Sequence, residues 1–174
     1  MKRLFVLLAL LAIVLLLASP ALGQPVVHVT GGGAGTFAQD LDGDGDIDGS
    51  RFGIGVVIAE GGVADGHFEC LMAGASDILG LPLMAVEANV TTGSADPQTG
   101  TASFGGVARV NLANGTIFSG VPIQVQVTAG AAGTATMRLT VIGAFDGVPG
   151  DQIPSNGNYD LPTETVERGR IDVH

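Results

Sequence analysis

Hydrophobic and polar positions alternate along most of the chain. Phe52, Ile54, Val56 and Ile58 hold every second position of one stretch, and mostly small residues lie between them. The same period of two recurs at 86–90, 121–128 and 137–141. Such alternation is typical of antiparallel strands with one buried and one solvated face. After residue 23 no window of ten or more residues has a clear 3.6-residue helical period, so we expect an all-β chain.

Turn signals divide this pattern into about eight strands. They include Gly61-Gly62, Asp96-Pro97 and Asn114-Gly115, of which the last is the strongest hairpin signal. We expect strands at 25–30, 52–60, 64–73, 83–92, 101–112, 116–128, 134–144 and 166–173. Short strands at regular spacing predict a single antiparallel β-sandwich or a partly open β-barrel.

Two glycine-rich segments are expected to lie outside the strands. Residues 146–165 are rich in Gly, Pro, Asn and Asp, which predicts a long ordered loop before the last strand. Residues 31–35 are almost all glycine and are expected to be a flexible entry to the first turn. They are not a phosphate-binding loop, because neither a Lys-Ser/Thr pair nor a helix follows them.

The first 23 residues have the layout of a signal peptide. Lys2 and Arg3 precede fifteen apolar residues, and Ser19-Pro20 then leads to the small residues Ala21 and Gly23. The apolar run is shorter than the ~20 residues of a membrane-spanning helix. We therefore expect cleavage after Gly23, or alternatively after Ala21, and a secreted domain at 24–174. This domain has no membrane span after cleavage and resides in the periplasm or the extracellular space.

Charge and cysteine content exclude several classes of protein. Loss of Lys2 and Arg3 leaves five arginines against 17 acidic residues, a formal charge of −12. Such a chain attracts cations and lacks the basic surface that nucleic-acid binding requires. A single cysteine cannot form a disulfide within the chain. Cys70 shares its strand parity with Phe68 and Met72, which favours a buried structural thiol over a reactive one.

Residues 40–51 carry the clearest chemical pattern. Carboxylates at positions 1, 3 and 5 and a glycine at position 6 of a loop fit the oxygen coordination of calcium. Position 12 holds Arg51 instead of a bidentate carboxylate, so we expect weak affinity, on the order of 10⁻⁴ to 10⁻³ M. The alternative is a solvated acidic loop without a metal. The predicted calcium ligands are Asp40, Asp42, Asp44, Asp46 and Asp48.

The remaining polar residues give weaker signals. His28, His67 and His174 have no close spacing in sequence, which favours surface or structural histidines over a zinc or copper site. No GxSxG or HExxH motif occurs.

Short glycine-based motifs resemble those of the post-COAP type of domain, a family of small exported bacterial β-domains. The motifs are Gly33-Ala-Gly35-Thr36-Phe37, Phe52-Gly53, Gly61-Gly62 with Gly66-His67-Phe68, Ala102-Ser-Phe104-Gly-Gly106, 156–162 and Gly169-Arg-Ile171-Asp-Val-His174. This resemblance implies an exported all-β domain without an assigned activity. It leaves open whether His67 and His174 lie close together across strands, either in a structural contact or as ligands of a shared metal ion. The acidic loop departs from the family pattern.

These observations favour a secreted, non-catalytic structural or interaction module, stabilised by calcium, with an unidentified protein or surface partner. One alternative is a carrier of a small apolar ligand, because a barrel of this size can hold one small molecule. A hydrolase is a third reading, which requires His67 or His174 within hydrogen-bond reach of an acid or a serine.

Overall fold

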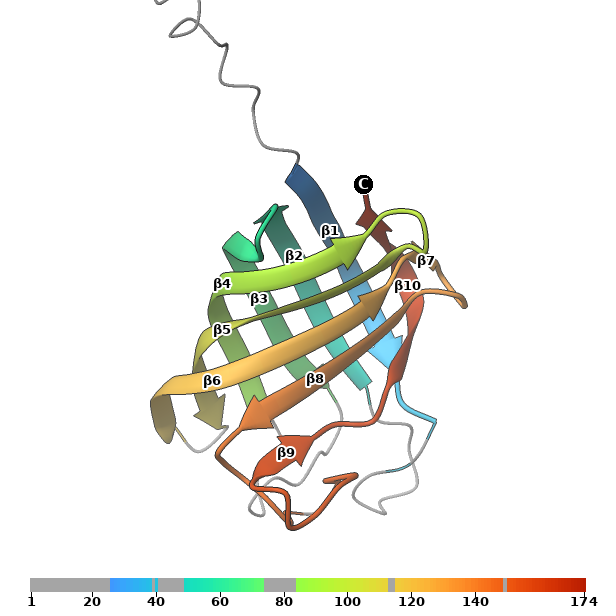
Figure 1. Cartoon of the computed structure of the whole chain (residues 1–174). Helices are drawn as coiled ribbons and strands as arrows, with labels where there is room; N and C mark the ends of the chain where they lie inside the picture. Colours follow the sequence, from blue (N-terminus) through green and yellow to red (C-terminus); the bar gives the residue numbers. More distant parts are fainter. Residues whose placement is uncertain (1–25, 39, 41–48, 74–83, 113–114, 149) are drawn as a thin grey trace, which may run out of the picture.

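A computed structural model of the chain describes residues 26–38, 40, 49–73, 84–112, 115–148 and 150–174. These residues form ten strands and no helix (Figure 1). The strands are β1 (Val26–Thr36), β2 (Gly49–Ala59), β3 (Val63–Ala73), β4 (Met84–Asp96), β5 (Thr101–Leu112), β6 (Ile117–Thr128), β7 (Gly130–Ala131), β8 (Thr136–Ile142), β9 (Asn158–Asp160) and β10 (Glu164–Val173).

All ten strands belong to one antiparallel sheet that curls into a ring. The strand order is β7-β10-β1-β2-β3-β4-β5-β6-β8-β9, and an additional pairing of β10 with β8 closes the ring through eight strands. That closing seam has only two residue pairs, Glu164 with Met137 and Thr165 with Thr136. The expected all-β, antiparallel fold of about eight strands is confirmed, with a single rolled sheet as in a partly open barrel.

The period of two in the sequence sorts residues between the inside and the outside of the ring. Phe52, Ile54, Val56 and Ile58 are buried, as predicted. Phe68 and Phe104 pack edge to face in the interior, with ring centroids 6.0 Å apart. A core with few aromatic residues is thus completed by aliphatic and methionine side chains. The largest fully buried ones among these are Met72, Met84, Leu112, Met137, Leu139, Ile171, Val29 and Val56.

Glycines allow strands to approach closely where the ring bends. Gly33 on β1 pairs directly with Gly169 on β10. A Cβ atom on Gly33 would lie 1.9 Å from the carbonyl oxygen of Arg168. Gly106 on β5 is equally tight, because its Cβ would lie 1.9 Å from the carbonyl oxygen of Asn89 next to a register shift of β4. Glycine is therefore required at these positions by steric contact with neighbouring backbone.

The prediction that residues 31–35 form a flexible entry to the first turn, outside the strands, was wrong. They lie inside β1 and pair with β2 on one side and β10 on the other. Glycines usually weaken a strand, but here they permit the close crossing of β1 and β10. The short strands β7 and β9 were not anticipated, and β10 begins at Glu164, two residues before the expected start.

Candidate functional site

The predicted calcium loop connects two paired strands. Thr36, near the end of β1, pairs directly with Gly49 at the start of β2. Residues 37–48 therefore join the two strands as the connection of a hairpin. Asp40 lies in this connection and is exposed. The other four predicted ligands, Asp42, Asp44, Asp46 and Asp48, lie outside the described residues, as does the predicted signal peptide 1–23.

Among the described residues, no three His, Cys, Asp or Glu side chains gather closely enough to hold a metal ion. The calcium assignment therefore remains a prediction about residues 40–48.

A buried serine–glutamate pair lies inside the ring close to this hairpin. Ser50 Oγ is 2.7 Å from Oε1 and 2.8 Å from Oε2 of Glu164. Ser50 and Glu164 are each only 2% exposed. Gly35 on the intervening strand β1 makes room for the carboxyl group, because a Cβ there would lie 2.7 Å from Glu164 Oε2. Burial raises the pKa of Glu164 to about 7, although hydrogen bonds from Ser50 partly oppose this shift.

Cys70 adjoins this pair and is buried, as predicted. Burial, together with the nearby Glu164 carboxylate, raises the pKa of its thiol to about 12, against a lowering contribution from Ser50. A thiol with such a pKa carries almost no thiolate at neutral pH and is a poor nucleophile. The cluster of Ser50, Cys70 and Glu164 therefore has the chemistry of an interior packing site with one titratable acid.

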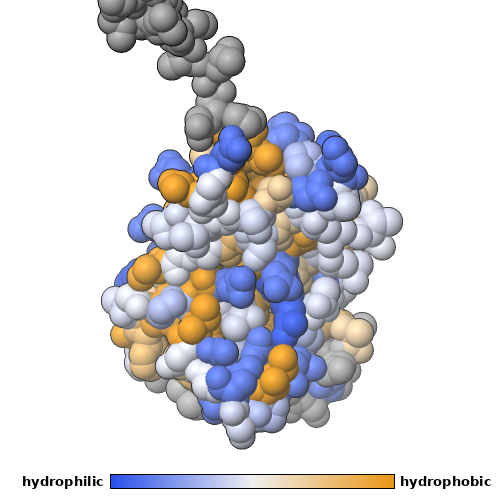
Figure 2. Space-filling view, viewed as in Figure 1, coloured by the Kyte–Doolittle hydropathy of each residue, from blue (hydrophilic) through white to orange (hydrophobic). Residues whose placement is uncertain are grey.

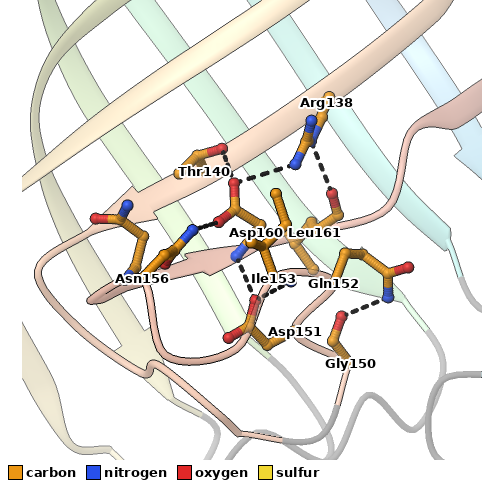
Figure 3. A network of polar contacts seen from close by, with 10 residues as sticks. Arg138, Thr140, Gly150, Asp151, Gln152, Ile153, Asn156, Asp160 and Leu161 are labelled. Atoms are coloured by element: carbon orange, nitrogen blue, oxygen red, sulfur yellow. Dashed lines mark hydrogen bonds and ion pairs between the residues drawn. The ribbon is translucent and has the colours of Figure 1, made fainter.

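A second polar network centres on the buried carboxylate of Asp160 in β9 (Figure 3). Arg138 Nη2 and Thr140 Oγ1 donate to Asp160 Oδ1 at 3.1 and 2.9 Å. Asn156 Nδ2 donates to Asp160 Oδ2 at 2.7 Å. Arg138 Nε also donates to the carbonyl oxygen of Leu161 at 3.3 Å. Both carboxylate oxygens are thus engaged, and the network joins β8 to β9.

Asp151 orders the loop before β9. It accepts backbone N–H groups of Gly147, Ile153 and Asp160 at 2.8, 3.0 and 3.2 Å. Burial acts to raise the pKa of Asp151, but these hydrogen bonds outweigh it and hold the pKa below its ordinary value.

Asp146 acts in the same way, accepting from the N–H groups of Ser155 and Gly157 at 2.7 and 3.0 Å. The expected loop at 146–165 contains β9 and the start of β10, so it is not loop throughout.

The three histidines fall into two places on the outside of the ring. His67 on β3 faces outward between Gly55 and Asn89, which are its pairing partners. His174 follows β10, and its imidazole stacks on that of His28 in β1. His67 lies two strands away from β1 in the sheet order, so the partner of His174 is His28 and not His67.

The outer face of β4, β5, β6 and β8 has two adjoining shallow grooves of about 540 Å³ each. Hydrophilic residues and smaller hydrophobic patches lie side by side on this face (Figure 2). Ser94 and Ser103 border both grooves. The first groove is lined mainly by uncharged polar and small side chains, with Asp96 and Arg138 as its charged residues.

Sequence reasoning did not identify the two buried acids. Glu164 lies two positions before the apolar Val166, so strand alternation places both on the inner face if the strand begins at 164. Asp160 lies between Tyr159 and Leu161, both buried, and this apolar context is a signal for a buried carboxylate.

Comparisons with protein-family models, with characterised proteins and with solved structures gave no match. The similarity to post-COAP domains therefore remains a resemblance of short motifs. In the part of the chain that the structure describes, no helix combines the length and the apolar character needed to cross a membrane.

Proposed function

We propose that this protein is an exported, non-catalytic structural or interaction domain that calcium stabilises through residues 40–48. The observation that carries the proposal is the direct pairing of Thr36 with Gly49. It fixes both ends of the aspartate-rich connection in the sheet. A loop with fixed ends loses less conformational entropy when it closes around an ion than a free segment does.

The roles of three acidic groups, Asp151, Asp160 and Glu164, support a non-catalytic domain. Asp160 and Asp151 use their oxygens to hold the loop before β9, and Glu164 is bonded to Ser50 in the interior. Each therefore has a structural task in the fold. These three carboxyl groups are therefore accounted for by the fold, as expected of a structural or interaction domain.

The grooves on β4, β5, β6 and β8 offer a surface for a partner. Their lining is rich in hydroxyl and amide side chains, such as Thr101, Ser103 and Gln126. Side chains of this kind form hydrogen bonds with polar partners without a cost of burying charge. The described inward side chains form one buried hydrophobic cluster, which favours a packed interior over the cavity that the carrier alternative requires.

The test is thermal melting of the secreted protein in millimolar calcium and in excess chelator. Calcium at a few times its dissociation constant contributes about 1 kcal/mol, which corresponds to a rise in Tm of about 2–4 °C. The double substitution Asp42→Asn with Asp44→Asn should abolish this rise.

The matched control is Asp65→Asn with Glu167→Gln, which removes the same charge from exposed strand positions. This control should keep the calcium response of the unmodified protein. Equal melting temperatures with and without calcium, or an equal loss of response in the control, would contradict the proposed calcium site.

A further inference from the structure

His28 and His174 are held side by side by the backbone of β1 and β10. The N–H of His28 donates to the carbonyl oxygen of His174 at 2.7 Å, and the N–H of His174 donates to the carbonyl oxygen of His28 at 3.0 Å. Two residues that exchange both hydrogen bonds occupy directly opposite positions of an antiparallel ladder. Their side chains consequently leave the sheet on the same face.

The two imidazoles point outward and lie against one another. Their ring centroids are 5.7 Å apart, and the ring planes are inclined by 19°. Both residues are exposed, whereas the neighbouring Val29 and Val173 face the core. Metal–nitrogen bonds of ~2.0–2.1 Å place two imidazoles on one ion with centroids roughly 5 Å apart. The observed spacing is close to that value, and rotation of the two exposed side chains would turn one nitrogen of each ring toward a shared ion.

Nearby charges leave this position open to a cation. Asp172 is on the same face of β10, two residues before His174. Arg170 forms an ion pair with Asp172, so the positive charge of Arg170 is neutralised next to the two histidines. The strongly acidic chain adds a general attraction for metal ions.

We infer that His28 and His174 form a binding site for a divalent transition metal of the zinc, nickel and copper group. Imidazole nitrogen is a ligand that these ions prefer, whereas calcium and magnesium prefer oxygen. Water completes the coordination of the ion. The bound metal links β1 to β10 at one end of their ladder. This site is separate from the proposed calcium loop and does not depend on it.

The experiment uses the exported protein without a polyhistidine tag. Isothermal titration with Zn²⁺ should show one site, and Zn²⁺ should raise Tm by about 2–4 °C at a few times the dissociation constant. His28→Gln and His174→Gln should each weaken Zn²⁺ binding at least tenfold and abolish the Tm rise. His67→Gln is the matched control, since it removes an exposed histidine two strands away from β1 and should leave both values unchanged.

A second readout does not depend on substitutions. The chain has only three histidines, so their ring-proton NMR signals can be followed individually. Substoichiometric Ni²⁺ should broaden the signals of His28 and His174 and spare those of His67. Equal broadening of all three histidines would overturn the inference. So would a Zn²⁺ affinity that His28→Gln and His174→Gln leave unchanged.

Discussion

The hydroxyl of Ser50 lies within 2.8 Å of both carboxylate oxygens of Glu164, although 114 positions separate the two residues in the chain. The contact joins β2 to β10 inside the ring, next to the seam where β10 meets β8. Desolvation makes the ionised form of this acid costly, because few polar groups replace the water that it loses. The Glu164 carboxyl therefore couples the stability of the ring to pH.

We expect the unfolding free energy to fall as pH rises from about 4.5 to above 7. The folded-state pKa of Glu164 is about 7, against 4.5 for the free side chain. The folded protein thus holds this proton more tightly than the unfolded chain, and the stabilisation present below pH 4.5 is lost as pH rises through 7. The full loss amounts to about 3 kcal/mol. Denaturant titrations at a series of pH values measure it.

Glu164→Gln isolates this effect from the other acids. The amide keeps an oxygen acceptor for Ser50 and has no proton to lose in this range. The variant should match the unmodified protein near pH 4.5 and exceed its stability at pH 8. Parallel pH profiles of the two proteins would show that folding does not shift the pKa of Glu164, which would contradict this prediction.

Removal of Arg138 should destabilise the protein far more than removal of an exposed arginine. Arg138→Ala leaves the buried Asp160 carboxylate without its cation, at a cost of about 1.5–3 kcal/mol. Arg109→Ala is the control, because Arg109 and Glu87 are at least half exposed and 3.9 Å apart. Such a pair contributes at most about 1 kcal/mol. Equal losses of unfolding free energy in the two variants would refute a structural role for the Asp160 network.

Cys70 should resist alkylation in the folded protein. Its thiol is 3% exposed and its pKa is about 12, so both access and thiolate content are low. Iodoacetamide at pH 8 should add no mass to the native protein within an hour and should modify Cys70 fully in denaturant. Rapid modification of the native protein would mean that the interior near Ser50 opens readily.

Two glycine-to-alanine substitutions should differ sharply in their effect. Gly106→Ala forces a Cβ against the carbonyl oxygen of Asn89 and should cost about 1–3 kcal/mol or more. Gly55→Ala is the control, because no atom lies within 4 Å of the added Cβ. It should be neutral or slightly stabilising, since alanine restricts the unfolded chain. Chemical denaturation compares the two, and similar midpoints would contradict the close packing at Gly106.

The all-β class of the fold was predictable because the alternation of apolar and polar residues recurs on most strands. Inward positions such as Ile54 and Val56 alternate with outward ones on strand after strand, and each strand repeats the same information. The glycines of β1 carried no such signal, because a residue without a side chain has no hydropathy period. Their role depends on the approach of β10, which is remote in sequence. Local pattern cannot reveal a contact of that kind.

The sites were harder to predict from the sequence than the fold, because most of them depend on contacts between residues remote in the chain. The calcium pattern is local and was visible at Asp40 to Asp48, where it remains a prediction. The pairs of Ser50 with Glu164 and of His28 with His174 arise only when the ring closes. The two residues of each pair are more than 100 positions apart in the chain, so no rule based on sequence spacing could have predicted the pair.

The pairing of β1 with β10 also has a consequence for how the chain reaches its native state. The first described strand, β1, finds its second neighbour only in the last one, β10, so most of the chain must be synthesised before the sheet can close. Until then β1 and β8 present unpaired backbone edges that can associate with other chains. A pairing between strands so distant in sequence forms slowly, whereas β1 to β6 pair in sequence order. Early completion of β10 would therefore protect the folding chain from association through these edges.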